Sequence, residues 1–218
     1  MVRAHEAGWA HAEGALRGPA WLREPADTNA LVEHLWAANV AKDASGELTV
    51  AGVPVSRIAA EHGTPAYVLD EDDFRGRARA FRDGFAGWDV YYAGKAFLCT
   101  AVARWVAEEG LCLDVCSEGE LAVALRAGVD PARIGFHGNN KSVRALQRAL
   151  EVGVGRIIVD SFHEIERLTD LTAGAGRRAP VMIRVTAGVE AHTHEYIATA
   201  HEDQKFGFSI TSGDALEA

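Results

Sequence analysis

From residue 65 onward, short apolar runs alternate with longer amphipathic stretches along the chain. The short runs are rich in β-branched and aromatic residues, as buried strands are, whereas the longer stretches repeat apolar residues every three or four positions, as helices do. This alternation, at nearly regular spacing, predicts a parallel α/β sheet whose strands are covered on both faces. The expected strands cover residues 66–70, 89–93, 111–115, 133–137, 156–160 and 180–185, and the expected helices cover 71–85, 97–109, 118–127, 142–152 and 162–172.

The two ends of the chain follow this pattern less closely. Residues 46–55 alternate on both sides of Ala51 and Gly52, which predicts a β-hairpin. We therefore divide the chain into an N-terminal segment that includes the hairpin, residues 1–63, and a larger α/β part, residues 64–218. The remaining expected elements are short helices over 27–36 and 56–62, a strand over 206–210 and a helix that begins at 211.

An eight-stranded barrel and an open doubly wound sheet both produce such an alternation. No Gly-x-Gly-x-x-Gly turn follows any expected strand, so the signature of a dinucleotide-binding sheet is missing. Nearly every strand ends instead in a polar residue, and in a barrel these ends converge on one mouth. We therefore expect an α/β fold that is part of a (β/α)8 TIM barrel, with two of the aspartates, Asp70 and Asp160, capping the helices that follow them. The strand-end residues are Asp70, Lys95, Asp114, His137, Asp160 and Arg184.

Lys95 stands out among these residues because it directly follows an apolar, aromatic run. A lysine at the end of a buried strand must find an anion, lose its proton or form a covalent bond. A lysine in that setting is a candidate for covalent attachment to a carbonyl cofactor. The alternative is a rim lysine whose stem lies on the barrel while its ammonium group reaches water. The lysine by itself leaves both interpretations open.

The composition limits the kinds of partner. The formal charge of −9 argues against nucleic acid, because phosphate binding needs a basic face. No apolar run approaches the roughly 18 residues of a membrane span, and the N-terminus lacks the apolar core of a secretory signal. The three cysteines, an odd number, indicate reduced thiols in a cytoplasmic protein. We therefore expect a small-molecule substrate, with no nucleic acid and no membrane as partner.

Several motifs resemble, in the same order, those of one enzyme family. Over about residues 46–210 the chain resembles the diaminopimelate decarboxylases, in particular their actinobacterial branch. The resemblance implies the alanine-racemase-like fold, in which a barrel binds pyridoxal 5'-phosphate and the N-terminal hairpin belongs to a separate β-domain. It also implies decarboxylation of meso-diaminopimelate to L-lysine and carbon dioxide, the last step of lysine biosynthesis. The motifs are Tyr92-Ala-Gly-Lys-Ala96, Asp114-Val-Cys-Ser-Glu-Gly-Glu-Leu121, His137-Gly-Asn-Asn-Lys-Ser142, Val159-Asp-Ser161 and the run from Arg184 to Glu195.

The resemblance also assigns roles to individual residues. Lys95 becomes the catalytic lysine that forms a Schiff base with the cofactor. Arg184 lies beside the pyridine ring, a place that suits a planar guanidinium group that keeps its proton. Asp114 balances the charge of Lys95 or of an incoming ammonium group. The cofactor-binding residues expected in this way are Lys95, Ala93, Asp114, Glu120, His137 and Arg184, and Asn139 is expected to face the same site.

The resemblance is incomplete in two respects. Phe97 stands where the family often has Asn, and Glu118 where it often has Gly, although neither change removes the chemistry. In the family, the phosphate loop, the ring-stacking histidine and the glutamate that pairs with the pyridine nitrogen come after the part that these 218 residues resemble. We therefore expect the chain to hold the lysine half of the site, to have no useful decarboxylase activity alone, and to act in the complete enzyme as a homodimer.

Three other functions stay open. Ornithine or arginine decarboxylase and alanine racemase share the fold. A truncated, non-catalytic relative would bind a full-length subunit instead of a substrate. A metal hydrolase is the third alternative, because a run of metal-ligating side chains lies in the expected loop before residue 205. These side chains are His192, His194, Glu195, His201 and Asp203.

Overall fold

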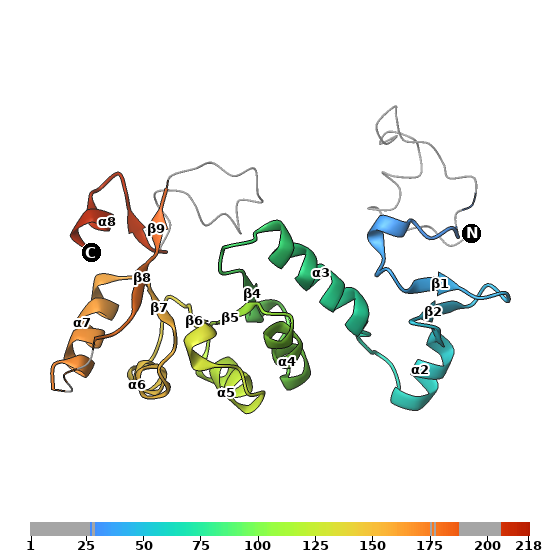
Figure 1. Ribbon diagram of the computed structural model, residues 1–218, viewed down its shortest axis with the longest axis horizontal. Helices are drawn as coiled ribbons and strands as arrows, with labels where there is room; N and C mark the ends of the chain where they lie inside the picture. The colour runs from blue at the N-terminus through green and yellow to red at the C-terminus, as the bar shows by residue number, and fades with distance from the viewer. Residues whose placement is uncertain (1–26, 28, 175, 177, 188–205) are drawn as a thin grey trace, which may run out of the picture. The chain divides into compact units, whose positions relative to one another are not determined.

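A computed structural model describes residues 27, 29–174, 176, 178–187 and 206–218 of the chain (Figure 1). The chain divides into two compact units, Met1–Asp70 and Glu71–Ala218. The expected boundary after residue 63 lies close to this division. The assignment of the first unit to a β-domain of the complete enzyme stays a prediction.

The first unit contains a three-stranded antiparallel sheet in the order β1-β2-β3. The expected hairpin is present, since β2 and β3 pair on either side of Ala51 and Gly52, with Val50 opposite Val53. The helix expected over 27–36 is wrong in length, because its described residues form only a short 3-10 helix. The elements are η1 (Glu33–Leu35), β1 (Val40–Lys42), β2 (Leu48–Val50), β3 (Val53–Pro54) and α2 (Val55–His62).

The start of the expected helix is occupied by a turn. The Asp27 carboxylate accepts a hydrogen bond from the Asn29 amide at 2.8 Å, and the Asp27 carbonyl accepts one from the Ala30 amide at 3.1 Å. An aspartate side chain that bonds to the backbone two residues later competes with helix formation. The helical spacing of the apolar residues is therefore overridden at this end.

The strand expected over 66–70 is also wrong. These residues join no strand ladder among the residues that the structure describes. Tyr67 is fully exposed, and Val68 and Leu69 are about half exposed. An apolar run becomes a strand only when its backbone pairs with a neighbouring strand, and no ladder among the described residues includes this run.

The second unit is built on a five-stranded parallel sheet with the order β4-β5-β6-β7-β8. Each strand thus pairs with the strand that follows it in the chain, without the reversal of a doubly wound sheet. Sequential parallel pairing is the arrangement found in a barrel. The strands are β4 (Tyr91–Ala93), β5 (Cys112–Val115), β6 (Ile134–Phe136), β7 (Arg156–Val159) and β8 (Val181–Ile183).

Helices connect these strands, and α4 to α7 lie on the same side of the row of strands (Figure 1). Three of them begin at a serine whose hydroxyl accepts a hydrogen bond from the backbone, as an N-cap does. The helix expected over 97–109 begins later, at Thr100. The helices are α3 (Glu71–Gly84), α4 (Thr100–Glu108), α5 (Glu118–Arg126), α6 (Val143–Val152) and α7 (Phe162–Thr172).

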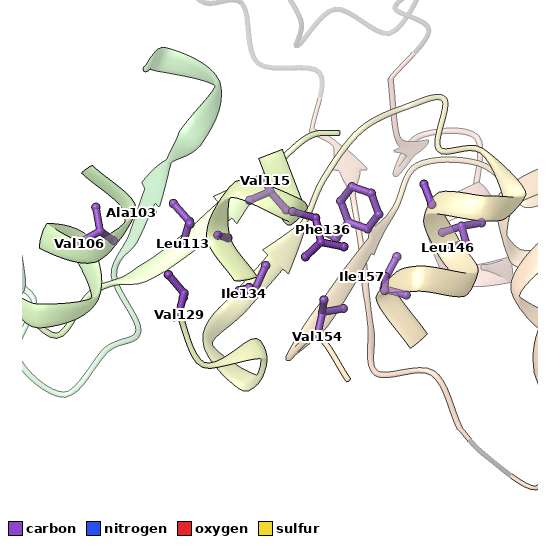
Figure 2. Packing of buried hydrophobic residues seen from close by; sticks show 14 of the residues in the cluster. Ala103, Val106, Leu113, Val115, Val129, Ile134, Phe136, Leu146, Val154 and Ile157 are labelled. Carbon is purple, nitrogen blue, oxygen red and sulfur yellow. The ribbon is translucent and has the colours of Figure 1, made fainter. Parts of the chain in front are cut away.

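The core of the second unit lies between the sheet and these helices (Figure 2). Phe136 is its largest fully buried side chain and comes from the central strand β6. Leu113 and Ile157 come from the neighbouring strands, and Leu121 and Leu146 from the covering helices. Burying side chains of this size stabilises the fold by about 1.5–3 kcal/mol each. The sheet therefore forms a rigid base for the residues at its edge.

The second unit also contains a small two-stranded sheet near the end of the chain. It pairs β9 (Val185–Thr186) with β10 (Phe208–Ser209) in parallel, with Phe208 opposite Val185. The strand expected over 180–185 is therefore interrupted at Arg184, where the chain passes from one sheet to the other. A short helix, α8 (Asp214–Glu217), follows near the expected position.

Candidate active site

The polar residues at the strand ends gather along one edge of the five-stranded sheet. Lys95 follows β4, His137 follows β6, Asp160 follows β7 and Arg184 follows β8, while Asp114 is the penultimate residue of β5. Because the strands are parallel and adjacent, their carboxyl ends share one edge. Five residues that are far apart in the sequence are thus brought to the same rim.

Lys95 lies in a short 3-10 helix, η2 (Gly94–Ala96), that follows β4. Its side chain is exposed, and it makes no hydrogen bond or ion pair with any residue that the structure describes. Burial raises the pKa of the nearby Cys116 thiol, and the positive charge of Lys95 opposes part of that rise. The amine is therefore accessible at the rim, and no carboxylate of the described residues holds it.

Gly94 holds the Lys95 turn close to β5. A β-carbon at Gly94 would lie 2.8 Å from the backbone oxygen of Asp114 and 3.7 Å from Oε2 of Glu120. Glycine is required at such a position because any side chain would push the two backbones apart. The absence of a β-carbon therefore lets Lys95 and Asp114 approach each other.

Asp114 and His137 lie in hydrogen-bonding contact between neighbouring strand ends, with His137 Nδ1 facing Asp114 Oδ1. The Asp114 side chain is 15% exposed and the His137 side chain 39%. Gly135 makes room for this pair, since its β-carbon would lie 3.2 Å from Asp114 Oδ1 and 3.2 Å from the ring of Tyr91. The His137 ring is thus oriented by a carboxylate that is largely shielded from water.

Glu120 lies in the first turn of α5, and its carboxylate is used locally. Oε2 accepts a hydrogen bond of 2.7 Å from the Cys116 amide, while the Glu120 amide donates to the hydroxyl of Ser117 at 3.2 Å. The two bonds resemble a capping box and fix the turn between β5 and α5. Glu120 therefore shapes the wall beside Lys95, and its expected contact with the cofactor stays a prediction.

Arg184 is held in place by two contacts. Its guanidinium donates to Asp160 Oδ1 at 3.0 Å and lies over the ring of Phe206, 4.7 Å from the ring centre. Asp160 is buried, whereas the Arg184 side chain keeps 32% of its surface exposed. The expectation that Asp160 caps α7 is wrong, because Ser161 is the N-cap and Asp160 binds Arg184 instead.

Ala93 and Asn139 also lie at the rim, whereas Asp70 belongs to the first unit. Ala93 ends β4 opposite Asp114 and is exposed, and Asn139 is exposed in the loop after β6. Asp70 immediately precedes α3 and accepts a hydrogen bond of 3.3 Å from the Asn39 side chain. All three cysteines are free thiols, as expected.

Two buried residues behind the rim were missed by the sequence reasoning. Lys141 and Glu164 have side chains that are 1% and 6% exposed, and Lys141 Nζ lies 2.7 Å from Glu164 Oε1. One signal was available for Glu164: it stands three residues after Ser161, which is the spacing of a capping box. Nothing in the local sequence indicated that Lys141 is buried.

The proposed metal ligands at residues 192–203 lie outside the described residues. Within the described ranges, no group of three or more His, Cys, Asp or Glu side chains is arranged to hold a metal ion. The same part of the chain contains no helix that is long and apolar enough to span a membrane.

Comparison with known proteins places the site in an enzyme class. The pyridoxal binding domain of the pyridoxal-dependent decarboxylases matches residues 71–218. The chain therefore belongs to the pyridoxal-dependent decarboxylase family. The matched range contains the complete five-stranded sheet and every residue of its polar rim.

Particular relatives are diaminopimelate decarboxylases, which confirms the resemblance. The protein from Mycobacterium bovis is 56% identical over 189 residues, which cover 86% of this chain and 42% of the relative. That from Mycobacterium leprae is 51% identical over 220 residues, covering 100% of this chain and 47% of the relative. The chain thus spans less than half the length of these curated relatives.

Solved structures of diaminopimelate decarboxylases share the fold. Diaminopimelate decarboxylase from M. jannaschii superimposes with a TM-score of 0.72 at 27% identity, covering 84% of this chain and 44% of that one. The Helicobacter pylori enzyme, complexed with L-lysine, gives 0.67 at 30% identity, covering 73% of this chain and 41% of that one. The expectation of a partial barrel of the alanine-racemase-like fold is confirmed.

Proposed function

We propose that this chain supplies the lysine half of a pyridoxal phosphate site that decarboxylates meso-diaminopimelate to L-lysine and carbon dioxide. The observation that carries the proposal is the accessible Lys95 amine, which lacks a carboxylate partner among the described residues and stands on the same rim as Asp114, His137 and Arg184. A cytoplasmic location and a homodimeric complete enzyme belong to the same proposal.

The rim residues fit the cofactor chemically. An amine that is not engaged in an ion pair is free to bind the aldehyde carbon of pyridoxal phosphate covalently. The close approach of Gly94 to Asp114 fixes the turn that presents this amine. When bound, pyridoxal phosphate supplies an electron sink for the pair of electrons that departing carbon dioxide leaves behind. The protein's task is then to orient groups and to place charge.

Asp114 and His137 provide an oriented proton site. A carboxylate only accepts hydrogen bonds, so the Asp114 contact fixes a proton on His137 Nδ1 and leaves Nε2 as the exchangeable position. Asp114 also places a negative charge beside the amine of an incoming substrate. Arg184, held by Asp160 and Phe206, presents a rigid planar cation to a ring edge or a carboxylate.

Covalent trapping tests the cofactor part of the proposal. The purified chain is incubated with pyridoxal phosphate, reduced with borohydride and digested, and the labelled peptides are mapped. We expect the label on Lys95, with the buried Lys141 unlabelled as an internal comparison and with no site-specific label in Lys95→Ala. A specific label on any other lysine, or none on Lys95, contradicts the proposal.

The substrate is tested separately, in a polypeptide that includes this chain and has the full length of the curated relatives. Carbon dioxide release is measured with meso-diaminopimelate, ornithine and arginine, and racemisation is measured with alanine. We expect release from meso-diaminopimelate that disappears in Lys95→Ala. Preference for ornithine or arginine, or racemisation of alanine, would replace the substrate assignment while leaving the cofactor assignment intact. A labelled but inactive complete polypeptide would support a non-catalytic relative.

A further inference from the structure

Lys141 and Glu164 form a buried ion pair that the proposed chemistry does not use. Lys141 Nζ donates hydrogen bonds to the carbonyl oxygens of Gly138 at 2.6 Å and Ile158 at 2.8 Å. Its third partner is the carboxylate of Glu164, at 2.7 Å. Glu164 Oε1 makes this ion pair and accepts no hydrogen bond from the described residues. The ammonium group is thus surrounded by three oxygens.

These contacts tie together loops from two neighbouring strands. Gly138 follows His137 at the end of β6, so the ammonium group fixes the segment that carries the imidazole. The carboxylate reaches the next strand end, where Glu164 Oε2 accepts a hydrogen bond of 3.0 Å from the Asp160 amide. Asp160 in turn binds Arg184. A single chain of polar contacts therefore runs from the His137 loop to the Arg184 guanidinium.

Further bonds hold the same loop to α7. The guanidinium of Arg167, on α7, donates to the carbonyl of Lys141 at 2.9 Å. Both the side chain and the backbone of Lys141 are therefore anchored to elements beyond its own loop. The loop after β6 is therefore held at its beginning, where Lys141 Nζ binds the carbonyl of Gly138, and at its end, where Arg167 binds the carbonyl of Lys141.

An ion pair at this depth is costly for stability alone. Removing two charges from water carries a desolvation penalty that their attraction often does not exceed, and apolar residues of similar volume frequently stabilise a protein as well or better. Supporting residues around a functional group gain importance instead by fixing the orientation of the groups that touch the ligand. The position of this pair, behind two rim residues, suits that second role.

We propose that Lys141 and Glu164 are positioning residues, whose ion pair sets the relative placement of His137 and Arg184 in the site. The expected effect on the capture of pyridoxal phosphate by Lys95 rests on the proposed function. The geometric part concerns only the two strand ends and stands by itself.

The test uses a double substitution in the full chain, Lys141→Met with Glu164→Gln. It removes both buried charges together and keeps an oxygen that can accept from the Asp160 amide. The matched control, Arg148→Met with Glu151→Gln, makes an equivalent change at an exposed pair on α6, whose side chains are 51% and 61% exposed. Each protein is examined by amide hydrogen exchange and by the pyridoxal phosphate concentration that half-saturates borohydride labelling at Lys95.

In the double variant we expect faster exchange in residues 137–142 and at the Arg184 amide, with exchange in the buried strand β5 unchanged. The half-saturating cofactor concentration should rise by about 10- to 100-fold, the range typical for loss of supporting contacts. The control should match the wild type in both measurements.

Wild-type exchange in both loops of the folded double variant would overturn the proposal. Should that variant fail to fold, the same measurements are made on Glu164→Asp, which keeps both charges and shortens the carboxylate arm, and wild-type values there would overturn it equally. If the wild type itself takes no label at Lys95, the proposed function fails, and the exchange comparison still decides whether the ion pair positions the loops.

Discussion

Substituting Gly94 by alanine tests the close contact between the Lys95 turn and the backbone of Asp114. The added β-carbon would lie 2.8 Å from the Asp114 carbonyl oxygen and 3.3 Å from the side chain of Leu98, whereas β-carbons are essentially never found below 3.0 Å. The oxygen belongs to the backbone of β5, which is paired with strands on both sides. The Lys95 turn must therefore move, because the strand cannot.

The expected loss of stability follows from two opposing effects. Inserting a methyl group into a well-packed site costs about 1–3 kcal/mol. Replacing glycine also restricts the unfolded chain, which stabilises the protein by about 0.4–1 kcal/mol. Overpacking is the larger effect, so the net destabilisation of Gly94→Ala should be about 1–2 kcal/mol. With a urea dependence of about 1–3 kcal/mol per M, the unfolding midpoint should fall by roughly 0.3–2 M.

Urea unfolding of the full chain, followed by circular dichroism, measures this change, and borohydride labelling measures the accessibility of Lys95 to the cofactor. Gly119→Ala is the control, because its β-carbon would meet Ser117 Oγ at an ordinary 3.8 Å within helix α5. Alanine is the better helix former by about 1 kcal/mol, so the control should be as stable as the wild type or more stable.

The two substitutions are thus expected to move the midpoint in opposite directions. The labelling of Lys95 should become less efficient only in Gly94→Ala. If Gly94→Ala instead raises the midpoint as the control does, and labels as efficiently as the wild type, the packing of the Lys95 turn against β5 is not what holds it in place.

Four further substitutions test the core and the site. Phe136→Ala should lower the free energy of unfolding by about 3–5 kcal/mol in urea titration, and Phe136→Leu by clearly less; equal losses would contradict the tight packing. Burial, followed by the charge of Cys112, raises the pKa of Tyr91 from 10.0 to about 12. The contribution of the neutral Tyr91 hydroxyl to stability is therefore complete below pH 10.0 and is lost as the pH rises through about 12. Tyr91→Phe should reduce the decrease of the urea midpoint over this pH range, and an unchanged decrease would refute this. Burial also raises the pKa of the Cys116 thiol while Lys95 lowers it, so Lys95→Met should raise this pKa further and slow alkylation of Cys116 near pH 9; faster alkylation would contradict the assigned electrostatics.

Most of the second unit could be predicted from local patterns. Its strands and helices each carry their own periodicity, so the ranges 118–127 and 162–172 agree with α5 and α7 within a residue. The gathering of Lys95, Asp114 and Arg184 at one edge followed from parallel pairing alone. These features depend on neighbours in the sequence or on the general geometry of a sheet.

Features that depend on distant partners could not be predicted. Residues 66–70 have the composition of a buried strand, but strand formation needs a ladder partner that the run itself does not specify. Asp160 precedes a helix, as many capping residues do, yet its partner is Arg184 in the following strand-to-strand connection. A lysine side chain is normally exposed, and the burial of Lys141 is compensated by oxygens of Gly138, Ile158 and Glu164, of which the last two lie outside the local sequence pattern.

The order of the strands has a consequence for how the polypeptide acquires this structure. Among the described residues, the strands of the parallel sheet pair only with strands next to them in chain order, as Tyr91 does with Cys112 and Leu113 with Ile134. A growing chain that emerges from the ribosome can therefore add one strand and one helix at a time, each docking on a unit already made. Ribosome-bound chains of increasing length should gain protease resistance in steps that match these units.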